Sequence, residues 1–353
     1  MRPARALIDL AALRHNYQLA RRRHGGRALA VIKANAYGHG AVRCAQALAT
    51  LADGFAVACL DEALELRAAG ISNAILLLEG VFDVAELELA ASHALWPVVH
   101  HEAQLRMIEA TPLATPLKVW LKVNSGMNRA GFTDSAVAAA WHRLRATGKV
   151  AEITLMSHFA RADEPQEPAT LTQIACFDAV TRGLEGAHSL ANSSAILAWP
   201  QAHRDWARPG ILLYGADPMP GEGNGLLPVM SLESTVMAVR EIEAGAALGY
   251  GARFVASERT RVGLVAMGYA DGYPRTVPDG TPVAIDGQPS RIIGRVSMDM
   301  LTVDLSALPG AGPGSRVQLW GREVAVNRIA AAVGTIAYEL LCNVKRVSFS
   351  YLD

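Results

Sequence analysis

Eight short apolar runs, separated by helix-like stretches, constrain the fold of this chain more than any other feature. The runs lie between residues 27 and 215, and most are continuously apolar rather than alternating. Such runs are typical of strands that are buried on both faces, as in a parallel sheet covered by helices. They are RALAVIKA from Arg27, GFAVAC from Gly54, AILLLEG from Ala74, LWPVVH from Leu95, LKVWLKVN from Leu117, EITLMSHF from Glu152, HSLANS from His188 and GILLYG from Gly210.

The stretches between these runs have helical character. Examples are AVRCAQALATLA, DEALELRAAG, VAELELAASH and SAVAAAWHRLRATG, and Gly70 and Gly148 stand where helices would stop. Eight strands alternating with helices predict an α/β fold, a (β/α)8 barrel of the TIM type.

After about Pro228 the pattern changes to β-rich runs. They include SLESTVMAVREI, RVGLVAMG, TPVAIDG, SRIIGRVSMDMLTVDL and SRVQLWG, and the step Asp286-Gly287 is a hairpin signal. The Gly- and Pro-rich stretch from Pro218 to Pro228 reads as a linker or exposed loop. We therefore expect a barrel domain over residues 1–225 and a mainly β C-terminal domain over residues 226–353.

Charge and composition narrow the possible partners. Lys plus Arg and Asp plus Glu both number 33, so no strong field favours nucleic acid or an anionic membrane, and a small molecule fits better as a partner.

We expect no membrane span and no signal peptide, because no apolar run is long enough and the start MRPARALIDL has no apolar core. The predicted location is the cytoplasm. The four cysteines lack metal-ligand spacing, so we expect reduced thiols and no metal site.

The ends of the predicted strands are unusually polar. In barrels of this type the active site lies at the carboxyl ends of the strands, so these side chains would meet at one mouth. They are Lys33 after the first strand, Lys122 and Asn124 on the fifth, Ser157 and His158 on the sixth, Asn192 and Ser193 on the seventh, and Arg208 just before the eighth.

Lys33 is the candidate nucleophile. Burial at a strand end would lower the pKa of its amine, as a lysine that links covalently to a carbonyl cofactor requires. The alternative, that its head reaches solvent past the strand end, is equally compatible with this feature alone. Tyr37, Gly38 and Gly40 follow, and they suit the placing of a hydroxyl and close backbone beside an anion.

The run RPGILLYG is a second candidate anion site. The amides of Gly210 and Ile211 can point at a phosphate while Ser193 supplies a hydroxyl. Strands eight and one are neighbours in a closed barrel, so a phosphorylated aldehyde cofactor could bridge Lys33 and these groups. Neither a GxGxxG nor a Walker sequence competes for that role.

Nine motifs in order resemble those of the alanine racemases, enzymes that use pyridoxal 5'-phosphate (PLP) and join a barrel to a β domain. The resemblance covers essentially the whole chain. The motifs are KANAYGHG from Lys33, LKVNSGMNRAG from Leu121, SHFARADE from Ser157, ANSSA from Ala191, RPGILLYG from Arg208, LGYGARF from Leu248, GYADGYPR from Gly268, GRVSMDM from Gly294 and AYELLC from Ala337.

The resemblance implies a two-base interconversion of L- and D-alanine. Lys33 would hold PLP and move the α-proton on the D side, while Tyr250 of the other subunit of a homodimer would do so on the L side. A hydrogen-bond chain would run from Tyr250 through His158 to Arg208, and Arg208 would face the pyridine nitrogen, where a fixed positive charge weakens the ring as an electron sink.

The resemblance also implies the remaining site residues. Phosphate binding would fall to Tyr37, Ser193, Gly210, Ile211 and Tyr338, and Arg129 with the Met298 backbone would hold the substrate carboxylate. Lys122 matches a position that is carbamylated in several family members. Tyr269 and Tyr338 resemble the inner gate of the substrate channel, and Asp163, Arg275 and Arg295 resemble its outer lining. Asn124 and Ser125 depart from the Asp and Thr that are frequent there, which concerns fine positioning.

Three other functions compete with this interpretation. A racemase of serine or of broader specificity differs only in the pocket, and a hydroxyl is hard for an apolar pocket to exclude. A PLP-dependent decarboxylase on the same plan is disfavoured by the Tyr250 motif and by Arg208. A non-catalytic PLP-binding homeostasis protein would lack residues 229–353 and the tyrosine that they carry.

Overall fold

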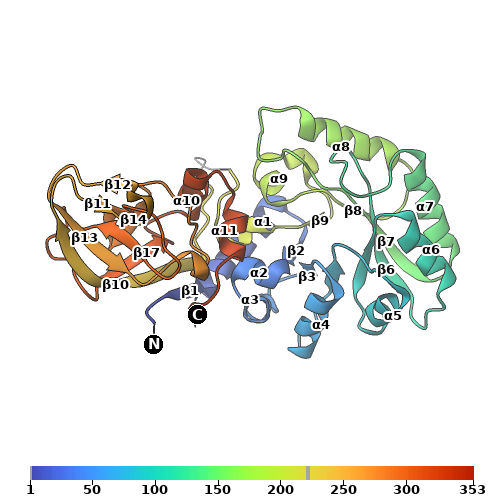
Figure 1. The fold of residues 1–353 in the computed structure, drawn as a ribbon. Helices are drawn as coiled ribbons and strands as arrows, with labels where there is room; N and C mark the ends of the chain where they lie inside the picture. The colour runs from blue at the N-terminus through green and yellow to red at the C-terminus, as the bar shows by residue number, and fades with distance from the viewer. Residues whose placement is uncertain (1, 220–222) are drawn as a thin grey trace.

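Across residues 2–219 and 223–353, which the computed structural model describes, an eight-stranded parallel sheet curls into a nearly closed barrel, followed by a mainly β unit (Figure 1). The strand order β8-β7-β6-β5-β4-β3-β2-β9 confirms the predicted fold class. The strands are β2 (Arg27–Val31), β3 (Gly54–Val57), β4 (Ile75–Leu77), β5 (Trp96–Val99), β6 (Leu117–Lys122), β7 (Val150–Met156), β8 (Ala187–Ser189) and β9 (Trp206–Ala207).

Helices cover the outside of this barrel. Their starts follow local chemistry: the Asp9 carboxylate accepts from the Ala12 N–H and the Asn192 side chain from the Ala195 N–H, which caps two of them. Gly70 and Gly148 have positive φ just beyond two helix ends, as predicted. The helices are α1 (Leu10–His24), α2 (Lys33–Gly38), α3 (Ala41–Leu48), α4 (Leu60–Ala68), α5 (Val84–Ser92), α6 (Glu102–Ala110), α7 (Ser135–Ala146), α8 (Ala169–Val180) and α9 (Ser193–Ala198), with a 3₁₀ turn η1 (Pro200–Ala202).

The prediction of the eighth strand was wrong. The run from Gly210 forms a buried 3₁₀ helix, η2 (Ile211–Tyr214), and the eighth strand is the two-residue β9, which pairs with β2. A short apolar run does not by itself distinguish a buried strand from a buried helical turn. Arg208 therefore follows the eighth strand instead of preceding it, and it lies at the same mouth as the other strand ends.

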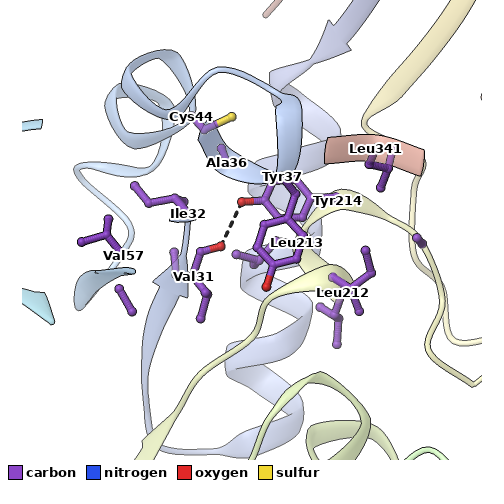
Figure 2. Packing of buried hydrophobic residues seen from close by; sticks show 14 of the residues in the cluster. Val31, Ile32, Ala36, Tyr37, Cys44, Val57, Leu212, Leu213, Tyr214 and Leu341 are labelled. Carbon is purple, nitrogen blue, oxygen red and sulfur yellow. Dashed lines mark hydrogen bonds between the residues drawn. The ribbon is translucent and has the colours of Figure 1, made fainter. Parts of the chain in front are cut away.

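Two hydrogen bonds join the ends of the barrel sheet. The Ser189 hydroxyl donates to the Trp206 carbonyl at 2.9 Å, and the Arg208 N–H donates to the Ala191 carbonyl at 2.9 Å. Inside this mouth, Tyr37 stacks on Tyr214 with ring centroids 4.8 Å apart, and the Tyr214 hydroxyl donates to the Val31 carbonyl (Figure 2). These contacts tie α2 and η2 to β2, the first strand of the barrel.

The second unit is built on a twisted sheet with the path β15-β14-β17-β10-β1-β18, extended from β10 through β13 to β16. Asp286 and Gly287 both have positive φ between β14 and β15, as a tight hairpin of the predicted kind requires. The strands are β10 (Met230–Ile242), β11 (Ala247–Leu248), β12 (Phe254–Val255), β13 (Thr260–Val265), β14 (Pro282–Ile285), β15 (Gln288–Arg291), β16 (Leu301–Asp304), β17 (Arg316–Trp320) and β18 (Ser348–Leu352); the helical pieces are η3 (Tyr250–Ala252), η4 (Tyr269–Asp271), α10 (Val326–Val333) and α11 (Ala337–Cys342).

The first strand, β1 (Arg5–Asp9), joins this second sheet. It pairs antiparallel with β10 and parallel with β18. The division between residues 225 and 226 stays a prediction, and residues 220–222 of the expected linker lie outside the described residues. Within the described residues no helix combines the length and the apolar character needed to cross a bilayer.

Candidate active site

Six of the eight predicted strand-end residues line one cavity of about 610 Å³ at the carboxyl ends of the barrel strands, whereas Asn124 and Ser157 lie outside its lining. This is where barrels of this type place their active sites. Among the predicted site residues, the lining includes Lys33, Tyr37, Lys122, Arg129, His158, Ser193, Arg208, Gly210, Ile211 and Tyr338.

Lys33 begins a left-handed turn, which the sequence did not predict. The residues from Ala34 to Tyr37 all have φ between 52° and 54°. Residues with a Cβ pay about 1–2 kcal/mol each for this conformation, so the turn needs support from its surroundings. The Glu62 carboxylate supplies it by accepting from the N–H groups of Ala34 and Ala58, each at 2.7 Å.

Glu62 is therefore a structural support for this turn, although its place in the first turn of a helix is equally typical of a solvated surface charge. The Asn35 side chain gives a second support, because it accepts from the Ala41 N–H at 2.8 Å. Together these contacts fix the backbone from which the Lys33 side chain enters the cavity.

Ser193, Gly210 and Tyr37 form a tight polar cradle at the same mouth, next to β2. The Ser193 Oγ accepts from the N–H groups of Gly210 at 2.9 Å and Leu212 at 3.3 Å, which leaves its own hydrogen free to donate. The Gly210 N–H had been expected to point at a phosphate, but in the structure it donates to the Ser193 Oγ. A Cβ on Gly210 would lie 2.6 Å from the Tyr37 hydroxyl, so glycine is needed here for space.

Arg208 is held rigidly by carbonyl groups. Its Nη1 donates to the Ser189 carbonyl at 2.9 Å and its Nη2 to the Ser157 carbonyl. Burial lowers the pKa of Arg208 to about 10, which still leaves it charged at neutral pH. The guanidinium is therefore a fixed cationic donor in the cavity wall.

His158 lies beside Arg208 as a neutral ring. Burial, followed by the positive charge of Arg208, lowers the pKa of His158 to about 3. The Arg208 Nη2 is 3.5 Å from the His158 Nδ1, and arginine has only donors, so Nδ1 is the acceptor and the proton is assigned to Nε2. The imidazole can thus donate a hydrogen bond from Nε2 while Arg208 supports its other nitrogen.

Lys122 ends β6 and adds a further cation to the wall. Burial, and then the positive charges of Arg208, Arg129 and Lys33, lower the pKa of Lys122 to about 8. A substantial fraction of this amine is therefore neutral near pH 8. The four cations that line the cavity face a single carboxylate among the described lining residues, Glu79.

Glu79 and His100 were not predicted as site residues. Glu79 is next to last in the third predicted run, and His100 ends the fourth. Both line the cavity, and burial lowers the pKa of His100. The position of each at a strand end was the available signal.

The remaining predicted residues lie outside the cavity of their own chain. Tyr250 on η3 is 68% exposed and Met298 is 53% exposed. Tyr269 and Arg275 line a separate hollow of about 460 Å³ in the second unit, and the Arg295 backbone lies beside Gly249. Asp163 is exposed near Tyr338, and burial together with the Asp163 charge raises the pKa of Tyr338 to about 12.

Two family models match this arrangement of a barrel and a β unit. The model for the N-terminal domain of alanine racemase matches residues 8–218, and the model for the C-terminal domain matches residues 229–351. An alanine racemase from Azoarcus sp. strain BH72 is 75% identical, with 99% of each chain covered, and a catabolic alanine racemase from Pseudomonas aeruginosa is 61% identical, with 99% of each chain covered.

Solved structures give the same result. The biosynthetic alanine racemase of Pseudomonas aeruginosa superimposes with a TM-score of 0.97 at 49% identity, covering 100% of both chains. The alanine racemase of Bartonella henselae, described with covalently bound pyridoxal phosphate, gives a TM-score of 0.91 at 29% identity, covering 100% of both chains.

The fold and the cationic cavity at the barrel mouth thus define the class of barrel-plus-β proteins with a site at the barrel mouth. The chain belongs to the alanine racemase family. This confirms the predicted family, and with it the predicted activity and cofactor at the level of that family.

Proposed function

We propose that this protein interconverts L- and D-alanine with PLP held at Lys33. The observation that carries the proposal is that Lys33, His158 and Arg208 line one cavity together with the polar cradle of Ser193 and Gly210. In this proposal residues 1–225 bind the cofactor, and residues 226–353 complete the site of a partner subunit.

The residues present fit PLP. Four cations and the free Ser193 hydroxyl suit a phosphate and a substrate carboxylate, and the space left by Gly210 lets the Tyr37 hydroxyl reach the same anion. Arg208 would face the ring nitrogen of PLP. The group would be held by Lys33, Tyr37, Ser193, Gly210, Ile211 and Tyr338. When bound, PLP supplies a carbonyl that links to amines and a ring that withdraws electrons from the substrate Cα.

Racemisation needs a base on each face of Cα, because a single base tends to return the proton to the face that it left. Lys33 serves the D side and Tyr250 of the partner subunit serves the L side. A tyrosine needs help to act as a base, since its ordinary pKa is about 10. The neutral His158, with its proton on Nε2 and Arg208 behind it, is suited to donate to the Tyr250 oxygen and to favour its ionised form.

The substrate carboxylate is bound by Arg129 and by the Met298 N–H of the partner subunit. Among the described residues the Met298 N–H has no hydrogen-bond acceptor, so it is available to a ligand. Lys122, whose amine is partly neutral near pH 8, is suited to react with carbon dioxide and to present an anion to Arg129. Tyr269, Arg275 and Arg295 would form the channel with Asp163 and Tyr338.

A homodimer is part of this proposal. Tyr250, Met298 and Tyr269 are exposed on the second unit, away from the cavity of their own chain, and a two-fold partner brings such a surface to a barrel mouth most simply. The cysteines Cys44, Cys59, Cys176 and Cys342 are all free, which supports a reducing compartment, the cytoplasm.

Deuterium wash-in at Cα tests the activity. Purified protein with PLP is incubated in heavy water with a panel of L-amino acids, and the products are separated by chiral chromatography. We expect alanine to exchange and to approach equal D and L forms, and bulky side chains not to exchange. Comparable exchange of serine would support the broader racemase, and PLP binding without any exchange would support the homeostasis protein.

A further inference from the structure

The turn that carries Met298 is built together with the turn that carries Tyr269. The Ser297 N–H donates to the Met300 carbonyl at 2.9 Å, which closes the first turn around Met298. The Tyr269 N–H donates to the Ser297 carbonyl and the Ala270 N–H to the Met298 carbonyl, each at 3.0 Å. Two backbone hydrogen bonds therefore join the turns into one body.

Asp271 is the buried centre of this body. Its side chain is fully buried, and its carboxylate accepts from the Gly268 N–H at 2.8 Å. The same carboxylate accepts from both terminal nitrogens of Arg2, at 2.5 and 2.7 Å. A bidentate pair of this kind fixes orientation as well as adding energy.

Two arginines from opposite ends of the chain also hold the Met298 turn directly. The Arg2 Nη2 donates to the Asp299 carbonyl at 2.6 Å, and the Arg346 Nη2 donates to the Asp299 carboxylate at 2.8 Å. Next to Arg346, the Lys345 N–H donates to the Asp271 carbonyl at 3.0 Å. Asp299 immediately follows Met298, so these contacts set the direction of the neighbouring peptide groups.

We infer that Arg2 and Arg346 are positioning residues for substrate binding: through Asp271 and Asp299 they hold the Met298 N–H at the angle at which it binds the substrate carboxylate. This inference rests on the proposed role of Met298. The competing interpretation is that the cluster only ties the chain ends together. Under that interpretation its loss lowers stability and leaves substrate affinity unchanged.

The test compares Arg2→Gln with Arg5→Gln in the PLP-loaded enzyme. Arg5 is a matched control: like Arg2, it is a partly exposed arginine near the same chain end and pairs with a buried carboxylate, that of Glu233, at 3.1 Å. Unlike Arg2, it does not contact the Met298 turn. Asp271→Asn is avoided, because a fully buried carboxylate whose charge is lost endangers folding.

Arg2→Gln removes the charge-assisted hydrogen bonds that hold the Met298 turn. We expect KM for alanine to rise about tenfold, because the Met298 N–H is displaced from the substrate carboxylate, while kcat changes much less, because the proton-transfer residues are untouched. The dissociation constant of acetate, a carboxylate that cannot react, should rise by a similar factor in calorimetric titration. Both constants of Arg2→Lys should lie between those of the wild type and those of Arg2→Gln. A lysine keeps the charge but cannot bridge Asp271 and the Asp299 carbonyl as the guanidinium does. Arg5→Gln should leave both constants unchanged.

Equal KM and acetate affinity in Arg2→Gln and Arg5→Gln would overturn the inference. Arg129→Leu then separates two causes. If Arg129→Leu weakens acetate binding and Arg2→Gln does not, only the positioning role fails. If neither variant weakens it, the proposed carboxylate site is itself wrong.

Discussion

At the scale of single residues, Gly210 allows the Tyr37 hydroxyl to lie close to the backbone of the cofactor cradle. Alanine at this position would place a Cβ 2.6 Å from the Tyr37 hydroxyl. We expect Gly210→Ala to weaken PLP binding by about tenfold or more, because the Tyr37 hydroxyl must shift, and to lower the unfolding temperature of the cofactor-free protein, since overpacking a close-packed site costs about 1–3 kcal/mol. Titration of that protein with PLP measures the effect.

Gly310→Ala is the control for this prediction. Gly310 is exposed, has no neighbour within 4 Å of an added Cβ, and lies far along the chain in the second unit. Equal PLP affinity in the two variants would show that the cradle is not where the cofactor phosphate binds.

Lys122 gives a pH-dependent prediction. Its pKa falls from 10.5 to about 8 in the folded protein, so the unfolded chain binds more protons between these values. The cost of burying the charge is fully present below pH 8 and disappears as the pH rises to 10.5. We therefore expect Lys122→Met to raise the unfolding temperature of the cofactor-free protein below pH 8, with a gain that shrinks across this window.

Lys118→Met provides the comparison, because Lys118 lies on the same strand with its head exposed and paired with Glu152. Because this head already lies in water, its removal relieves no burial cost, and we expect no gain in unfolding temperature. A Lys122→Met gain that stays constant between pH 8 and pH 10.5 would contradict the assigned burial cost. Unfolding scans in carbon dioxide-free buffer keep any carbamate out of the measurement.

At the scale of elements, the left-handed turn of α2 depends on Glu62 of α4. Glu62→Ala removes the acceptor from two N–H groups, so we expect a loss of about 1–3 kcal/mol in the free energy of unfolding and weaker retention of PLP. Urea titration and PLP titration measure the two effects. Glu65→Ala, an exposed position on the same helix, should change neither, and similar losses in both variants would refute the role given to Glu62.

Elements also show how much of the site was predictable. Strand ends could be read from apolar runs, and for this reason Lys33, Lys122 and His158 were placed together correctly in the cavity. The strand β9 has only two residues, too few for any periodicity to appear, while the longer apolar run after Gly210 folds as a 3₁₀ helix.

Other parts of the site depend on contacts between distant segments. Four consecutive residues with positive φ include two alanines and a tyrosine, which individually disfavour that conformation, so no local signal announced the turn. Glu62 looks like any acidic residue in the first turn of a helix, and only the fold brings it to Ala34. The ion pair of Arg2 with Asp271 joins residues 269 positions apart and had no sequence signature.

At the scale of the whole molecule, the proposed shared site can be tested by mixing two inactive variants. The Lys33→Ala variant lacks the base on the D side of the substrate Cα, and the Tyr250→Phe variant lacks the base on the L side. When equal amounts are refolded together, half of the dimers are hybrids, and each hybrid has one complete site and one doubly defective site. We expect about a quarter of the wild-type activity to return.

Each variant refolded alone supplies the baseline for the mixture. If the mixture stays at that baseline although hybrids form, as differently tagged chains would reveal, then Tyr250 acts within its own subunit or not at all. A single-chain site would also keep activity at dilutions where the protein is monomeric.

The pairing of β1 with β10 and β18 has a consequence for biosynthesis. Arg5 lies opposite Ser348, so β1 is synthesised well before β18, the strand that pairs with one of its edges. The barrel strands occupy the chain between residues 27 and 207 and can associate while synthesis continues. The second sheet is completed only after β18 is synthesised, and until then the edge of β1 that pairs with β18 is open and must be kept from wrong partners.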